Sequence, residues 1–114
     1  MKLSDIVKEL SLDIKTYKDG LQSDVTGAYV SDLLSDVMAN SKEGNIWITL
    51  QTHINIVAVA SLKVIKGIII VSNRPVPEET LKKAEEEKIT IMTTPMSAFE
   101  IAGKIYRILE DSRQ

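Results

Sequence analysis

The chain has 114 residues, of which 44% are hydrophobic and 26% are charged, and its formal net charge at pH 7 is −2. A chain of this length fits one domain that buries roughly two thirds of the surface its unfolded form exposes. The lack of cysteine excludes disulfides, thiolate catalysis and cysteine-ligated metals, and the interleaving of lysines with acids leaves no basic surface for a nucleic-acid partner.

Residues 1–24 predict a short helix followed by an edge strand. In LSDIVKEL the apolar residues recur at helical spacing behind Ser4, a good N-cap. Leu12, Ile14 and Thr16 then alternate with polar residues, as in a strand with one exposed face. The N-terminus, MKLSDIVKEL, lacks the features of a secretory signal, and no segment reaches the roughly 18 apolar residues that cross a bilayer. We therefore expect a cytoplasmic protein without a membrane partner.

The next segment, VTGAY, predicts a short extended stretch that leads into a helix over SDLLSDVMAN. The helix is expected to begin after Ser31 or Asp32 and to stop at the polar cluster SKEGN. Its apolar stripe comprises Val30, Leu33, Leu34, Val37 and Met38.

A regular rhythm of strands and helices begins at residue 45. Residues 46–50, 67–72 and 89–94 are short, β-branched runs that are apolar on both alternating faces, which is typical of a parallel sheet covered by helices. Residues 54–65, INIVAVASLKVI, have strand-favouring side chains. The length of this segment and the need for a crossover between parallel strands favour a buried helix closed by Gly67.

Two further helices are expected. In PVPEETLKKAEEEK, Pro77 suits the first helical position, the two following glutamates stand four residues before lysines, and only Leu81 and Ala84 face inward. The last helix begins near Ser97, which forms a capping box with Glu100. Its wide apolar face comprises Ala98, Ile101, Ala102, Ile105, Ile108 and Leu109.

The pattern predicts an α/β fold: a three-layer α/β/α sandwich around a small, mainly parallel sheet of four to five strands. Residues 1–114 are expected to form a single domain. Residues 1–24 would supply the N-terminal helix and edge strand, residues 25–110 the core, and residues 111–114 a frayed tail.

Ligands of open parallel sheets bind beyond the carboxyl ends of the strands, and polar residues follow each predicted strand at that point. Hydroxyls, amides, an imidazole, a guanidinium and helix N-termini are expected there, which together suit an anion or phosphate. With Gly27, whose backbone a ligand could approach, the candidate ligand-binding residues are Gly27, Gln51, Thr52, His53, Ser72, Asn73, Arg74, Thr93 and Thr94.

Simpler structural roles compete with these assignments. Thr52 suits the N-cap of the following helix with His53 at its first position, and Arg74 suits an exposed turn. Trp47 is expected in the core, and Gly27 at a close-packed or positive-φ position. His53 is the only histidine, so no metal site is expected. As a general base it would need a hydroxyl or water brought close by the fold, and no catalytic residue is assigned.

Three stretches carry a family resemblance that is strongest from Val25 to about Leu109: VTGAYVSDLL, ITLQTHINIVAVASL and GIIIVSNRPVPEETLKKAEEEKITIMTTPMSAFEIAGKI. They resemble the DRTGG-domain family, a small α/β module similar in fold to the N-terminal domain of HPr kinase/phosphorylase. Both name-giving motifs are replaced. Thr52 and His53 stand where the family has Asp-Arg, and residues 71–73, Val-Ser-Asn, stand where it has Thr-Gly-Gly.

The resemblance implies a non-catalytic regulatory or ligand-sensing module, without a cofactor, of the kind attached to CBS domains, phosphotransacetylase or inorganic pyrophosphatase and often packed as a homodimer. Its expected ligand is a small anion or a nucleotide, or else a partner protein docks on the strand ends. One alternative is an adaptor for a larger partner enzyme, since similar short proteins are encoded with iron-only hydrogenases. A second alternative is an enzyme acting on a phosphorylated small molecule, and it depends on His53 near hydroxyls.

Overall fold

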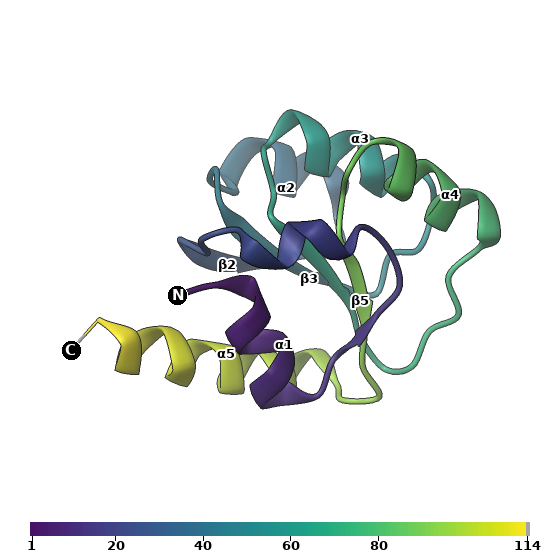
Figure 1. Cartoon of the computed structure of the whole chain (residues 1–114). Coiled ribbons are helices and arrows are strands. Elements are labelled where there is room, and N and C mark those ends of the chain that lie inside the picture. Colours follow the sequence, from purple (N-terminus) through teal and green to yellow (C-terminus); the bar gives the residue numbers. More distant parts are fainter. Residues whose placement is uncertain (114) are drawn as a thin grey trace.

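The computed structural model describes residues 1–113 and has a sheet with helices on both sides (Figure 1). Its strands are β1 (Asp13–Ile14), β2 (Gly27–Val30), β3 (Asn45–Thr49), β4 (Gly67–Ile70) and β5 (Ile91–Thr93). Its helices are α1 (Leu3–Leu10), the 3-10 helix η1 (Lys18–Gln22), α2 (Leu34–Asn40), α3 (Asn55–Leu62), α4 (Glu78–Glu86) and α5 (Ala98–Ser112).

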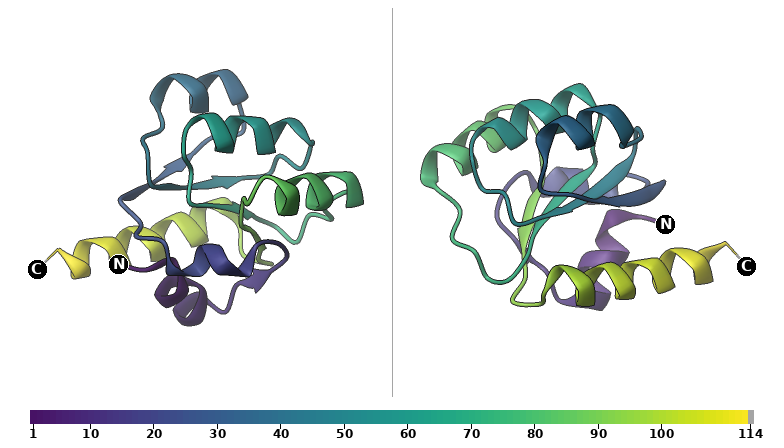
Figure 2. Two further views of the ribbon diagram at one scale, coloured as in Figure 1. Left: turned by 45° about the horizontal axis from the view of Figure 1, so that its top comes forward. Right: turned by 180° about the vertical axis from the view of Figure 1, so that it is seen from behind.

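The sheet has five strands in the order β1-β5-β4-β3-β2, and only β1 runs antiparallel to its neighbour. Helices α1 and α5 lie on one face, while α2, α3 and α4 lie on the other (Figures 1 and 2). This arrangement confirms the predicted three-layer sandwich with a mainly parallel sheet. It also confirms that the first strand lies at an edge.

Alternation along the strands divides the apolar residues between two cores. In β3, Ile46 and Ile48 pack with α1 and α5, whereas Trp47 packs with the three helices of the other face. Trp47 is fully buried, as predicted, and its indole N–H donates to the Ser31 carbonyl at 2.8 Å. Both sheet faces are therefore covered, which explains why β3 and β4 read as continuous apolar runs.

The first two helices begin at positions other than those expected. Helix α1 starts at Leu3 with Lys2 at the N-cap, so Ser4 lies inside its first turn. Helix α2 starts only at Leu34, because the Ser31 side chain accepts a hydrogen bond from the Leu33 N–H and closes a local turn first. The predicted stripe of α2 is largely solvent-exposed, and Val37 is its only buried residue.

The helical prediction for residues 54–65 is confirmed, but the helix is shorter than expected. Helix α3 ends at Leu62, and Val64 then adopts a left-handed conformation with φ of 54°. The Val64 carbonyl accepts a hydrogen bond from Gly44 at 2.9 Å, which fixes this reversal. Gly67, expected to close the helix, is instead the first residue of β4.

Helix α4 differs in its details from the expected surface helix. Pro77 is the N-cap rather than the first helical residue, and its carbonyl accepts from the N–H groups of Thr80 and Leu81. Thr80 is fully buried beside Ala84, whereas Leu81 is only partly buried. Neither expected glutamate–lysine pair forms, and the ion pair present joins Lys83 to Glu87 at 3.4 Å.

Helix α5 begins as predicted, with the Ser97 hydroxyl accepting the Glu100 N–H at 3.2 Å. Its end was predicted wrongly, because residues 111 and 112 are helical rather than frayed. The Arg113 guanidinium pairs with the Glu110 carboxylate at 2.7 Å across this last turn, which helps to hold it. Residue 114 of the expected tail lies outside the described residues.

The edge strand β1 is held against β5 by Thr16. The buried Thr16 hydroxyl donates to the Ile89 carbonyl at 2.7 Å and accepts the Ile91 N–H at 2.8 Å. The Lys15 N–H adds a bond to the Ile91 carbonyl at 2.8 Å. A two-residue strand therefore gains side-chain bonds that substitute for a longer ladder.

Replacement of Thr16 by Val keeps the shape of the side chain but leaves the Ile91 N–H and the Ile89 carbonyl buried without this partner. Each unsatisfied buried group costs about 1–3 kcal/mol, so we expect the free energy of unfolding to fall by about 2–4 kcal/mol. Urea denaturation measures the change. Thr52→Val is the matched control, and an equal loss in both variants would contradict this role of Thr16.

Candidate functional site

The carboxyl ends of β3, β4 and β5 lie at one edge of the sheet, because these strands are parallel. The structure therefore places most of the predicted site residues along this edge. Gly27 is the exception. It is the first residue of β2 and so lies at the amino ends of the parallel strands, away from the other candidates. A Cβ on it would lie 3.2 Å from the Asn45 side chain. Close packing explains this glycine.

The end of β3 is occupied by internal hydrogen bonds. The Asp32 carboxylate accepts the Thr49 hydroxyl at 2.8 Å and the Leu50 N–H at 2.7 Å. The Gln51 side-chain amide donates to the Asp32 carbonyl at 2.9 Å. Gln51 is thus committed to the loop before α2 and is a structural residue rather than an open ligand contact.

Thr52 was expected at the N-cap of α3, but the helix begins at Asn55 with Ile54 at its N-cap. The His53 Nδ1 accepts the Asn55 N–H at 3.0 Å, and the His53 carbonyl accepts the Ile56 N–H at 3.0 Å. Thr52 makes no side-chain cap bond, and its carbonyl accepts the Thr80 hydroxyl at 2.9 Å instead. The predicted Thr52 cap is therefore wrong, because a contact with α4 holds Thr52 away from the helix start.

The turn that follows β4 has two successive left-handed residues, Ser72 with φ of 59° and Asn73 with φ of 54°. Their N–H groups donate to the carbonyls of Met96 at 2.8 Å and Thr94 at 2.9 Å. The backbone of this turn is thus tied to the segment that follows β5. A left-handed conformation costs a non-glycine residue roughly 1–2 kcal/mol, and asparagine tolerates it best. These are the two positions at which the resemblance places glycines.

The end of β5 contributes one structural residue, Thr94, and one residue of the site, Thr93. Thr94 is 2% exposed, and its hydroxyl accepts the Met96 N–H at 3.2 Å. Thr94 therefore shapes the turn between β5 and α5. Thr93 lines a cavity of about 220 Å³ together with residues from the β4 exit.

This exit cavity unites three of the predicted residues, Asn73, Arg74 and Thr93, with two that were not predicted, Asp13 and Lys15. Its other lining residues are apolar: Pro75, Val76 and Leu81. The Lys15 ammonium pairs with the Asp13 carboxylate at 2.9 Å, and both side chains remain partly exposed. Arg74 forms no ion pair within residues 1–113. The exit cavity therefore has a net positive charge, an amide and a hydroxyl beside an apolar wall.

Sequence reasoning missed Lys15 and Asp13 because they come from the antiparallel edge strand. The register places Asp13 opposite Thr93, so the β1 side chains reach the ends of β4 and β5. The signal present in the sequence was the alternation around Ile14. This alternation indicates a strand, but it does not tell which strand of the sheet it pairs with or in which direction it runs.

The helix N-termini near this edge already have partners within the protein. The His53 Nδ1 accepts the N–H of Asn55, the first residue of α3, and Ser97 caps α5. The first turn of α4 carries Glu78 and Glu79, which already balance the positive end of its dipole. The charge that favours an anion at this edge thus comes from Lys15 and Arg74.

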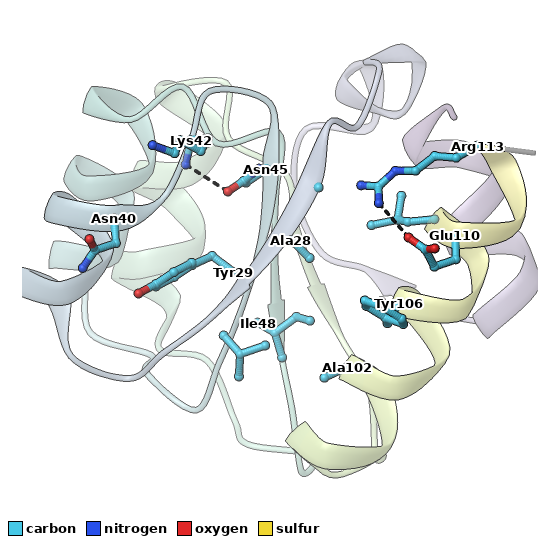
Figure 3. A pocket seen from close by; sticks show the side chains of 13 residues that line it. Ala28, Tyr29, Asn40, Lys42, Asn45, Ile48, Ala102, Tyr106, Glu110 and Arg113 are labelled. Carbon is cyan, nitrogen blue, oxygen red and sulfur yellow. Dashed lines mark hydrogen bonds and ion pairs between the residues drawn. The ribbon is translucent and has the colours of Figure 1, made fainter.

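A larger cavity of about 430 Å³ lies along β2 and is shown in Figure 3. Tyr29 extends from β2 toward α2, while Ala102 and Tyr106 approach from α5. The Tyr29 hydroxyl donates to the Asp36 carboxylate at 2.8 Å. Hydrogen bonds from Ser31, Tyr29 and Asn40 hold the pKa of Asp36 below its usual range, and the bond to Asp36 raises the pKa of Tyr29.

Neither cavity has the features of a metal centre. Within residues 1–113, no three histidine or acidic side chains are grouped closely enough to hold an ion. Over the same range, no helix combines the length and the apolar character needed to cross a bilayer.

Comparison with known proteins finds no matching family model and no matching curated sequence. A search of solved structures finds the regulatory region of Clostridium perfringens pyrophosphatase, comprising CBS and DRTGG domains, in complex with its activator diadenosine tetraphosphate. The TM-score is 0.74 at 20% identity, and the match covers 91% of this chain and 45% of that one. The chain thus has the fold found in a CBS and DRTGG regulatory region and spans less than half the length of that protein.

Proposed function

We propose that this protein is a non-catalytic regulatory module that binds a small phosphate-bearing anion in the exit cavity. The observation that carries the proposal is the convergence of Lys15 and Arg74 on one cavity from segments that lie far apart in the chain. Ligand sites in open parallel sheets lie at this same edge.

The chemistry of the exit cavity suits one charged end of a ligand. Arg74 can donate two parallel hydrogen bonds to a phosphate, and Lys15 supplies a second positive charge. The Asn73 amide and the Thr93 hydroxyl offer neutral hydrogen bonds, and Val76 and Leu81 offer an apolar surface beside them. A volume of about 220 Å³ is small for a whole nucleotide, so the rest of a larger ligand would lie outside the cavity.

Backbone strain also supports a role for this turn. Ser72 and Asn73 keep a left-handed conformation that glycine would adopt without cost. Residues with strained backbone conformations cluster at active sites and ligand-binding sites. The solved structure with the same fold is a regulatory region with a bound nucleotide activator, which agrees with a sensing role.

One alternative is an adaptor that docks a larger enzyme. It is favoured by the exposed apolar side chains Leu33, Met38, Phe99 and Tyr106, of which Phe99 is 91% exposed. An enzymatic role for His53 is not supported by the geometry, because its Nδ1 already accepts a hydrogen bond and His53 does not line the exit cavity.

We also propose that residues 1–114 act as one domain, that the protein works in the cytoplasm, and that it does so as a homodimer. DRTGG membership is part of the same proposal, and it is supported by the shared fold together with the sequence resemblance.

At least one of ATP, a diadenosine polyphosphate, pyrophosphate and acetyl phosphate is expected to raise the melting temperature of the protein. A ligand at one hundred times its Kd stabilises the folded state by about 2.7 kcal/mol. Differential scanning fluorimetry measures the shift. Constant melting curves with every phosphate-bearing probe would contradict the ligand part of the proposal.

Replacement of Arg74 by Ala is expected to weaken binding of the active probe roughly tenfold or more, because a hydrogen bond to a charged group contributes about 1.5–3 kcal/mol. Isothermal titration calorimetry measures the Kd. Arg107→Ala, an exposed arginine of α5 outside the exit cavity, is the matched control and should leave the Kd unchanged. Unaltered binding after removal of both Arg74 and Lys15 would exclude the exit cavity as the site.

Replacement of Ser72 by Gly is expected to increase the free energy of unfolding by about 0.5–1 kcal/mol, since it removes left-handed strain at a smaller cost in chain entropy. Chemical denaturation measures the gain. Ser61→Gly, in the exposed face of α3, is the control and should destabilise by about the same amount. A loss of stability in Ser72→Gly would show that the serine side chain holds the turn.

A further inference from the structure

Strand β2 forms an edge of the sheet, and within residues 1–113 no strand pairs with its outer side. Edge strands in proteins usually carry a lysine, a proline or a bulge that blocks pairing with another chain. The residues of β2 are Gly27, Ala28, Tyr29 and Val30, and they include none of these features. Ala28 is exposed, and Val30 is 51% exposed. This edge is therefore open to strand addition.

The opposite edge of the sheet is protected. Strand β1 has only two residues, and its Asp13 forms an ion pair with Lys15, the residue that follows the strand. Charged side chains on a short edge strand are the usual means by which proteins block strand pairing. The contrast between the two edges isolates β2 as the site where another strand can pair.

The register shows which backbone groups of β2 are free. The Ser31 N–H donates to the Ile48 carbonyl at 3.3 Å, with Val30 opposite Ile48. Because inward and outward groups alternate along a strand, Tyr29 and Gly27 direct their backbone groups to β3. Ala28 and Val30 then direct their N–H and carbonyl groups away from the sheet, toward an incoming strand.

The sequence of β2 is complementary to itself in an antiparallel arrangement. If Ala28 forms a hydrogen-bonded pair with Ala28 of a second copy, Tyr29 lies opposite Gly27 of that copy. The largest side chain of the strand thus faces the residue that has none. Ala28 is small enough to let the two strands approach at their centre.

Charge also favours a second copy. No charged residue lies within β2, so the pairing brings no like charges together at its centre. Lys42 lines the cavity beside the start of β2, and Asp36 lies beside its end, bonded to Tyr29. An antiparallel pair brings the Lys42 end of one copy toward the Asp36 end of the other, which places opposite charges on the same side.

We infer that two copies of this chain associate through β2 as an antiparallel pair centred on Ala28, forming one continuous sheet of ten strands from the five in each copy. The Ala28 side chain lies within the 430 Å³ cavity, between β2 and Tyr106 of α5 (Figure 3). The second copy would cover this cavity and the exposed Tyr106, which is 69% accessible. This interface rests on the homodimer proposed above, but it does not depend on the proposed ligand, and its test needs none.

Light scattering after size-exclusion chromatography is expected to give twice the 12.7 kDa mass of one chain. Ala28→Lys places two lysines opposite each other and should yield a monomer. Ala28→Glu should do the same, and a mixture of the two variants should restore the dimer because the facing charges are then opposite. Ala58→Lys, at an exposed alanine of α3, is the matched control and should remain dimeric.

A cysteine at position 28 tests the register directly, since the chain has no other cysteine. Paired residues of this kind have Cα atoms about 5.5 Å apart, which a disulfide spans. Oxidised Ala28→Cys should run as a covalent dimer, and Ala58→Cys should not. A wild-type monomer up to the solubility limit, a dimer that persists in folded Ala28→Lys, or no faster cross-linking at position 28 than at 58 would each overturn the inference.

Discussion

The contact between β1 and β5 is the interaction on which the candidate site depends. The Thr16 hydroxyl bonds to two backbone groups of the segment leading into β5, and this fixes a strand of only two residues at the edge of the sheet. Lys15 and Asp13 thereby reach the ends of β4 and β5. Without this contact Arg74 would face solvent with no second cation nearby, and the exit cavity would lose one wall.

The central part of the fold was predictable because its signals are local. Three β-branched runs predicted the parallel strands, and Ser97 predicted the start of the last helix. The errors occurred where tertiary contacts override local preference. A hydroxyl from α4 draws Thr52 out of the cap position, and a bond from Gly44 holds Val64 in a conformation that valine rarely adopts.

The candidate site was predicted only in part, because local signals place some of its residues and tertiary contacts place the others. Asn73, Arg74 and Thr93 follow parallel strands, and the common direction of those strands brings them together. Gln51 and Thr94 satisfy the same rule, yet their side chains are used in internal hydrogen bonds that the sequence does not reveal. Lys15 required knowledge of which strand its segment joins and in which direction.

The unequal edges of the sheet have a consequence for assembly. A sheet that accepts strands at both ends can add copies indefinitely and grow into fibres. Here the β1 end is blocked by charge and by its length, so any growth must start at β2. The proposed pairing of β2 with β2 of a second copy would occupy the open edge of each molecule, so association would stop at a closed dimer whose two outer edges are both β1.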